Sequence, residues 1–67
     1  MHFVYPNIVQ LMAERGMGYT DLAGVLGISE PAAYRRLRGS ARWQLDEIVK
    51  LCHFFDTSDM DWLFKRF

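Results

Sequence analysis

The sequence predicts an all-α fold, a compact bundle of five helices in one domain that spans residues 1–67. Three observations lead to this prediction. Apolar residues recur at three- and four-residue intervals, and no period-two alternation is long enough for a strand. Glycine and proline stand at the boundaries between these periodic segments. The chain is also 51% hydrophobic and 15% aromatic, which argues against disorder even though a chain this short buries only about 60% of its unfolded surface.

The first two helices are bounded by proline and glycine. Pro6 suits the first turn of a helix, where a missing N–H leaves no hydrogen bond unmade. Gly16 and Gly18 end that helix, and a second follows over residues 19–26. Gly27 ends the second helix in the left-handed conformation that glycine adopts at little cost. The periodic residues are Ile8, Leu11, Met12 and Arg15 in the first helix, and Leu22, Ala23 and Leu26, expected to be buried, in the second.

The third helix has the clearest division between a core face and an exposed face. Ser29 is a good N-cap, because its hydroxyl can accept from the free amides of the first turn, and Gly39 ends the helix. With successive residues about 100° apart, Ala33 and Leu37 point together toward the core. Arg35 points almost directly away from them. The flanks of the exposed face hold Pro31, Ala32 and Arg38, and its margins hold Tyr34 and Arg36.

Two further helices complete the bundle. A fourth is expected over residues 44–55, and a short fifth from Ser58 or Asp59 to Phe64, with acids in its first turn where the helix dipole favours them. Trp43, in the linker before the fourth helix, is expected to cover the core; the alternative is a phosphate contact from its indole N–H. The core face of the fourth helix is expected to hold Leu45, Ile48, Val49, Cys52 and Phe55, with Leu51 and Phe54 off that face.

The charges are unevenly distributed although the net charge is zero. Residues 31–44 contain four arginines and no acid, so the exposed face of the third helix is positive, with small residues near its start. That shape suits the major groove of B-DNA, which admits a helix. Arg35 can make a bidentate contact to guanine, and the later arginines can reach phosphates. The alternative is an ordinary solvated arginine face, with Glu30 as the one acid near the start of the helix.

Other classes of site lack their residue patterns. The sequence has no metal-ligand spacing, no catalytic triad motif and no phosphate-binding glycine loop, so we expect no metal, no cofactor and no enzyme. No apolar run approaches the roughly 18 residues of a membrane helix, so we expect no membrane partner. The lone Cys52, expected in the core, excludes an internal disulfide and fits a reducing cytoplasm.

Three stretches, in order along the chain, carry a family resemblance. They are LAGVLGIS, then Ala33 followed by Leu37 inside RRLRG, then WQLDEI. With these spacings the chain resembles the Cro and lambda-repressor-like helix-turn-helix family, from about Tyr5 to Phe64, and looks most like short phage-encoded regulators. The resemblance implies a compact five-helix domain that binds operator DNA as a symmetric dimer.

Position by position, the resemblance makes residues 29–38 the recognition helix. The base-contacting positions that it implies are Glu30, Pro31 and Arg35, with Ala32 and Tyr34 alongside. Glu30 has two open roles, because it could accept from a cytosine amino group or support the helix N-terminus.

Phosphate contacts are expected around the recognition helix. The resemblance places one at Tyr19, at the start of the second helix, and others in the loop after the recognition helix. The full set of expected phosphate contacts is Tyr19, Arg36, Arg38, Ser40 and Arg42. Three positions depart from the family pattern: Gly18 and Gln44 replace better helix caps, and Pro31 replaces a polar base-reading residue.

The C-terminal third carries more apolar surface than one small bundle covers. The candidate homodimer interface consists of Phe54, Trp62, Phe64 and Phe67. The sequence thus predicts a DNA-binding transcriptional regulator of phage or prophage type, whose two recognition helices enter successive major grooves of a palindrome about 34 Å apart. The alternative is a protein-binding adaptor or anti-repressor that keeps the fold without operator binding, which the zero net charge and Pro31 favour.

Overall fold

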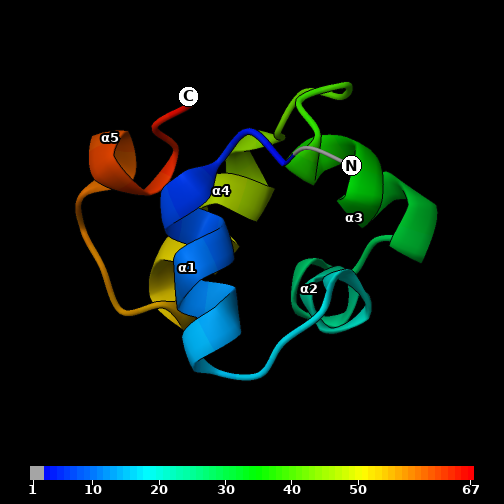
Figure 1. Cartoon of the computed structure of the whole chain (residues 1–67), viewed down its shortest axis with the longest axis horizontal. Coiled ribbons are helices and arrows are strands. Elements are labelled where there is room, and N and C mark those ends of the chain that lie inside the picture. Colours follow the sequence, from blue (N-terminus) through cyan, green and yellow to red (C-terminus); the bar gives the residue numbers. More distant parts are fainter. Residues whose placement is uncertain (1–2) are drawn as a thin grey trace.

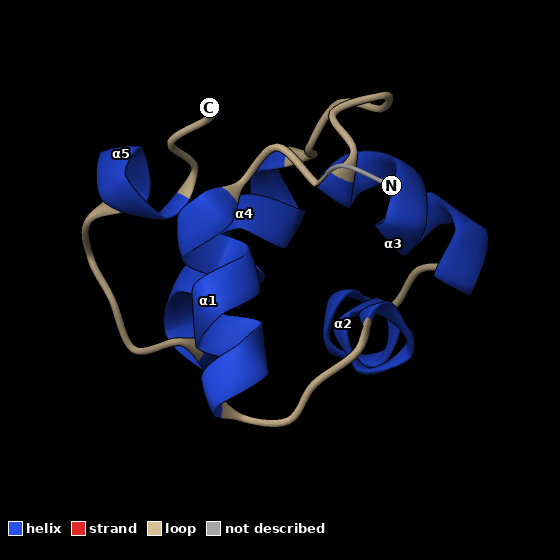
Figure 2. Cartoon of the chain, viewed as in Figure 1, coloured by secondary structure: helices blue, strands red, loops and turns tan. Residues whose placement is uncertain are grey.

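The computed structural model describes residues 3–67, and within that range it contains five α-helices and no strand (Figure 1, Figure 2). The helices are α1 (Pro6–Glu14), α2 (Tyr19–Leu26), α3 (Glu30–Leu37), α4 (Leu45–Phe54) and α5 (Met60–Leu63). The predicted all-α fold is confirmed, with helix boundaries close to those expected. Over this same range no helix combines the length and the apolar character that crossing a bilayer requires.

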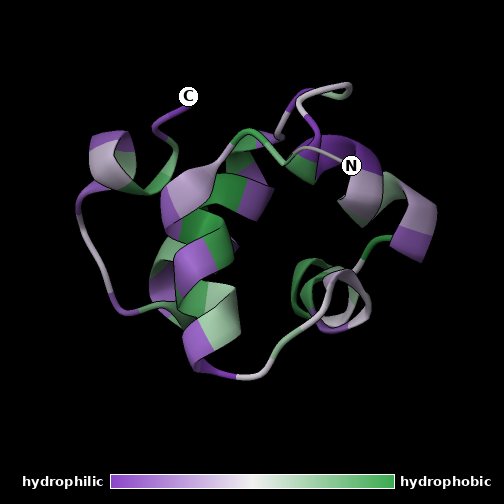
Figure 3. Cartoon of the chain, in the orientation of Figure 1, coloured by the Kyte–Doolittle hydropathy of each residue, from purple (hydrophilic) through white to green (hydrophobic). Residues whose placement is uncertain are grey.

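All five helices contribute to one core. α2 packs against both α3 and α4, and α5 packs against α1 and α4. Figure 3 shows hydrophobic residues running through α1 and α4, whereas α3 is mostly hydrophilic. The burial expected for Leu22, Ala33 and Leu37 is confirmed, because solvent reaches none of the three side chains. The buried apolar residues are Tyr5, Ile8, Met12, Leu22, Ala23, Leu26, Ala33, Leu37, Leu51, Cys52, Phe55 and Leu63.

Hydrogen bonds at the first turns explain where the short helices begin. Ser29 Oγ accepts from the Ala32 N–H at 3.2 Å, which confirms Ser29 as the N-cap of α3. Gly18 has no side chain with which to cap α2, but the Asp21 carboxylate accepts the Gly18 N–H at 2.9 Å. The Asp59 carboxylate caps α5 in the same way as Ser29 caps α3, at 3.0 Å. α2, α3 and α5 therefore each start where a side chain supplies an acceptor.

α4 is rotated about its axis relative to the orientation that its hydrophobic pattern predicts. Leu51, expected off the core face, is fully buried, whereas Leu45 and Val49, expected in the core, are 75% and 45% exposed. Glu47 is buried on the same side of α4, where its carboxylate accepts the Gln44 N–H at 3.0 Å and pairs with Arg36 of α3. Leu51 lies one turn after Glu47 on the same side of the helix, so it is buried as well.

α3 ends in a Schellman turn. Gly39 has a φ of 78°, in the left-handed region that glycine adopts without strain. The N–H of Gly39 donates to the Arg36 carbonyl at 3.1 Å, and the N–H of Ser40 donates to the Arg35 carbonyl at 2.9 Å. The predicted stop at Gly39 is confirmed, and the chain turns sharply away from α3 toward α4.

Both terminal segments reach the end of α3. The Val4 N–H donates to the Leu37 carbonyl at 2.9 Å. The Phe67 N–H in turn donates to the Val4 carbonyl at 3.1 Å. These two backbone bonds place the last residues of the chain beside the last turn of α3, although thirty positions separate Leu37 from Phe67 in the sequence.

An aromatic cluster covers the core between α3 and α4. The Trp43 ring meets Tyr5 edge-on with 5.7 Å between centroids and Phe64 with 5.0 Å, so its expected covering role is confirmed. Its indole N–H is buried without a partner among residues 3–67, so it does not offer the alternative phosphate contact. Phe64 also packs edge-on against Tyr5 at 6.2 Å. This corrects the expectation that Phe64 is free for a dimer partner, because its ring completes the core of its own chain.

Candidate nucleic-acid interface

The outward face of α3 is open to solvent. Because Ala33 and Leu37 are completely buried, they fix the rotation of the helix and turn Pro31, Arg35 and Arg38 outward, as expected. α3 lies at the periphery of the molecule (Figure 1). Pro31 occupies the first turn of α3, where its missing N–H breaks no helical hydrogen bond.

An open cleft of about 530 Å³ lies at the first turns of α2 and α3. The edge of the Tyr19 ring meets Tyr34 with 5.6 Å between centroids, which ties the start of α2 to the side of α3. Tyr19 is 40% exposed. The cleft brings together five residues that the sequence singled out: Tyr19, Glu30, Pro31, Tyr34 and Arg35.

Glu30 is held in place at this cleft by a residue of α2. Thr20 Oγ1 donates to Glu30 Oε1 at 3.1 Å, a hydrogen bond that links the first turns of α2 and α3. Glu30 lies in the first turn of α3, where the helix dipole favours a carboxylate, and it remains exposed to solvent. Both of its expected roles are compatible with this position.

Arg36 does not belong to the exposed basic face. Its Nε lies 2.6 Å from Glu47 Oε1 and its Nη2 lies 3.0 Å from Glu47 Oε2, a bidentate pair between α3 and α4. Only 13% of the Arg36 side chain and 5% of the Glu47 side chain are exposed. This corrects the expectation that Arg36 anchors a phosphate, because moving its guanidinium to DNA would leave a buried carboxylate unpaired. Arg36 instead fixes α3 against α4.

The other arginines of this region are free of carboxylates. Within residues 3–67, no carboxylate lies within 4.0 Å of Arg35, Arg38 or Arg42, and all three side chains are exposed. The Arg38 guanidinium carbon lies 5.8 Å from the centroid of the Tyr34 ring, so Arg38 is held beside the cleft. Ser40 is exposed in the following turn, and because its N–H is bonded to α3, its hydroxyl is the group it can offer to a phosphate.

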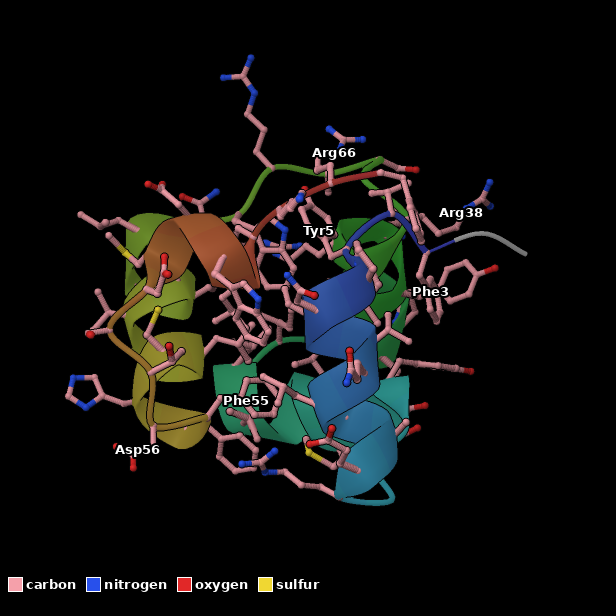
Figure 4. All side chains as sticks on the ribbon, turned by 60° about the vertical axis from the view of Figure 1, so that its left-hand side comes forward. Phe3, Tyr5, Arg38, Phe55, Asp56 and Arg66 are labelled. Atoms are coloured by element: carbon pink, nitrogen blue, oxygen red, sulfur yellow. The ribbon has the colours of Figure 1, made fainter. Side chains whose placement is uncertain are left out.

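Three residues at this surface were not identified from the sequence: Phe3, Thr20 and Arg66. The Phe3 ring packs edge-on against Tyr34 at 5.7 Å. Thr20 follows Tyr19 directly, so a search for polar side chains at the start of α2 could have found it. Arg66 has no comparable signal, because only the tertiary fold brings it to α3. In Figure 4, Arg66 lies at the top of the view and Arg38 at its upper right, both away from Phe55 and Asp56.

The remaining candidates for a dimer contact are exposed. Phe54 and Trp62 are 44% and 42% exposed, and Phe67 is 90% exposed. The rotation of α4 adds further apolar surface that the sequence did not suggest. The residues that it adds are Leu45 and Val49 on α4, and Met60 on α5 is exposed as well.

Cys52 lies beside a second open cavity, of about 500 Å³, formed by α4 and the segment that leads to α5. Burial raises the pKa of the Cys52 thiol, which keeps it protonated and unreactive at neutral pH. The thiol therefore behaves as a small apolar side chain, as expected for a residue in the core.

Comparison with known families agrees with this geometry. A family model described as the Cro/C1-type HTH DNA-binding domain matches residues 7–61. The matched range runs from α1 into α5 and includes the cleft and the basic face of α3. No curated protein and no solved structure matches the chain significantly. The two helices joined by a tight turn and the extent of the family match lead to one conclusion: the chain belongs to the Cro/C1-type helix-turn-helix DNA-binding family.

Proposed function

We propose that the chain is a transcriptional regulator that recognises an operator by placing α3 in the major groove. The observation that carries this proposal is the exposed face of α3, where Arg35 and Arg38 have no carboxylate partner. The bidentate pair between Arg36 and Glu47, at the margin of that face, holds the helix in a fixed position. A rigidly held helix with one free basic face fits the roughly 12 Å width of the major groove.

Arg35 is the leading base contact in this proposal. Its guanidinium can donate two parallel hydrogen bonds to O6 and N7 of guanine. Pro31 cannot donate a hydrogen bond, but together with Tyr34 it offers apolar surface suited to a thymine methyl group. Glu30 can accept from a cytosine amino group while Thr20 holds its other oxygen. Ala32, which is small and half-buried, permits close approach of the helix to the bases.

The phosphate contacts lie on both sides of these base contacts. Tyr19 can donate its hydroxyl from the start of α2, and Ser40 can donate its hydroxyl from the turn after α3. Arg38 and Arg42 supply the charge, which accounts for most of the affinity of a phosphate contact. Arg36 is left out of this set because of its pairing with Glu47.

Two copies are expected to bind a palindrome, with their recognition helices about 34 Å apart. The exposed rings of Phe54, Trp62 and Phe67 are the proposed contact between copies. The likeness to short phage-encoded regulators supports a phage or prophage origin and action in the cytoplasm. Sedimentation of the protein with and without operator DNA tests the dimer, with two copies per palindrome as the expected stoichiometry.

The function is tested in two steps. Bound fragments are first selected from random DNA, and the selected site is then titrated with the wild type and two variants. Arg35→Ala removes the proposed guanine contact, and Arg15→Ala removes an arginine that lies instead over the Phe55 ring, at 4.9 Å. Since a bidentate base contact is worth about 1–3 kcal/mol, Arg35→Ala should weaken binding by roughly one order of magnitude and relax the preference for guanine. Arg15→Ala should bind within about twofold of the wild type, since its side chain touches no base in the proposed complex.

Two results would contradict the proposal. The first is equal affinity of the Arg35→Ala variant and the wild type for the selected site. The second is the absence of any DNA binding by the wild type at low salt, which would favour a protein-binding role for the same fold. Thermal melting of both variants checks that the measured affinities are those of folded proteins.

A further inference from the structure

The end of the chain forms part of the surface next to the recognition helix. The Phe67 N–H is bonded to the Val4 carbonyl, and the Val4 N–H is bonded to the Leu37 carbonyl in the last turn of α3. Backbone bonds thus fix residues 4 and 67 relative to α3. Arg66, which precedes Phe67, is carried to the turn that follows α3.

Gly39 and Tyr5 hold the Arg66 side chain in a defined place. A Cβ atom added to Gly39 would lie 2.5 Å from Arg66 Nη2 and 2.9 Å from Val4 Cγ2, so the guanidinium packs directly on the Gly39 backbone. The Arg66 guanidinium carbon also lies 5.5 Å from the centroid of the Tyr5 ring. A side chain that is already positioned loses less conformational freedom when it binds a ligand.

The charge of Arg66 is available to a partner. Within residues 3–67, no carboxylate lies within 4.0 Å of Arg66, and the residue is exposed. Gly39 is flanked by Arg38 and Ser40, two residues with proposed phosphate contacts. Figure 4 shows Arg38 and Arg66 at the same end of the molecule, from which the Arg38 side chain extends outward. Arg66 therefore adds a fourth unpaired arginine to Arg35, Arg38 and Arg42.

We propose that Arg66 binds a DNA phosphate next to the groove that receives α3, so that the C-terminal segment is part of the DNA interface. This inference rests on the proposed operator binding and names a contact that α2, α3 and the turn after α3 do not supply. Arginine suits the role because its planar guanidinium donates two parallel hydrogen bonds to phosphate oxygens.

The test compares Arg66→Met with Lys65→Met in titrations of the selected DNA over a range of salt concentrations. Both variants lose one charge at adjacent exposed positions, and methionine keeps an unbranched apolar stem against Tyr5. Loss of one phosphate contact should make the negative slope of log K against log salt shallower by about 0.9. At about 0.1 M salt, this change corresponds to roughly an eightfold loss of affinity. Lys65→Met should keep the wild-type slope, and Arg66→Lys should keep it as well.

The inference is overturned if Arg66→Met and Lys65→Met bind alike, or if Arg66→Met keeps the wild-type slope. If Arg35→Ala still binds the selected DNA weakly, either result contradicts only the Arg66 contact, and the proposed function stands. A wild-type protein that fails to bind DNA contradicts the proposed function itself. If melting shows that Arg66→Met is unstable, Arg66→Gln and Arg66→Lys provide the same comparison, since both keep a polar head beside Gly39 and only lysine keeps the charge.

Discussion

Arg35 and Arg36 are adjacent in the sequence, but a step of about 100° around α3 gives them different surroundings. Arg35 projects into solvent, where it can meet a base. Arg36 reaches Glu47 on α4 and forms the bidentate pair between the two helices. Glu47 also accepts the Gln44 N–H, so the same carboxylate caps α4 and positions α3. The basic face therefore depends on an arginine that is not part of it.

Removing one member of this pair should be more harmful than removing both. Arg36→Met leaves the Glu47 carboxylate buried without its partner, and we expect a loss of about 3 kcal/mol in the free energy of unfolding. Glu47→Leu leaves the guanidinium unpaired and should cost a similar amount. The double variant should be more stable than either single variant, because apolar side chains then pack together. Urea unfolding measures all three, and losses that simply add in the double variant would contradict this account.

α2 is the element whose stability is easiest to improve. Gly24 lies inside this helix, where glycine is less stable than alanine by about 1 kcal/mol, and a Cβ there would meet no atom within 4 Å. Gly24→Ala should therefore raise the melting temperature by about 4 °C or more. Gly16→Ala is the matched control, because it also adds a Cβ to open space but at a φ of 65°. It should lower stability by about 1 kcal/mol. Stabilisation by both substitutions would show that backbone conformation does not decide the outcome.

The helices themselves were predictable because their ends carry local signals. Ser29, Gly27 and Gly39 act within a few residues of their own position, and the structure places each where the sequence indicates. The exposure of Arg35 was predictable for the same reason, since Ala33 and Leu37 fix the rotation of α3.

The rotation of α4 was not predictable from its hydrophobic pattern. Any such pattern places a charged Glu47 outside, and the sequence of α4 does not reveal that its partner is Arg36 on another helix. Leu51 is buried and Val49 is exposed, which is the reverse of what the hydrophobic pattern predicts. Phe64 and Arg66 escaped prediction for a related reason, because their neighbours Trp43 and Gly39 are distant in the sequence.

At the scale of the whole molecule, the C-terminal aromatic residues divide into one that holds the fold and others that face solvent. Phe64 packs against Trp43 and Tyr5, so Phe64→Ala should lower the free energy of unfolding by about 3 kcal/mol. Phe67 is 90% exposed, and Phe67→Ala keeps the backbone bond to Val4, so it should change stability by less than about 0.5 kcal/mol. Thermal or urea unfolding of the two variants measures both changes. Equal losses of stability would contradict the claim that Phe64, and not Phe67, holds the fold.

The proposed DNA-binding face and the exposed apolar face are formed by different elements of the molecule. The cleft, Arg35, Arg38 and Arg42 belong to α2, α3 and the segment after α3, while most of the large exposed apolar side chains belong to α4, α5 and the last residue. The proposed DNA contacts and the proposed contact between two copies therefore use different residues and do not compete.

The most direct test is an NMR titration of the labelled protein with the selected DNA, which reports the response of each backbone amide. We expect the largest shift changes on residues 19–20, 29–42 and 66, with little change at Val49, Phe54 and Met60 when the DNA carries a single half-site. Changes concentrated on α4 and α5, with α3 unaffected, would contradict the claim that the free basic face of α3 binds DNA.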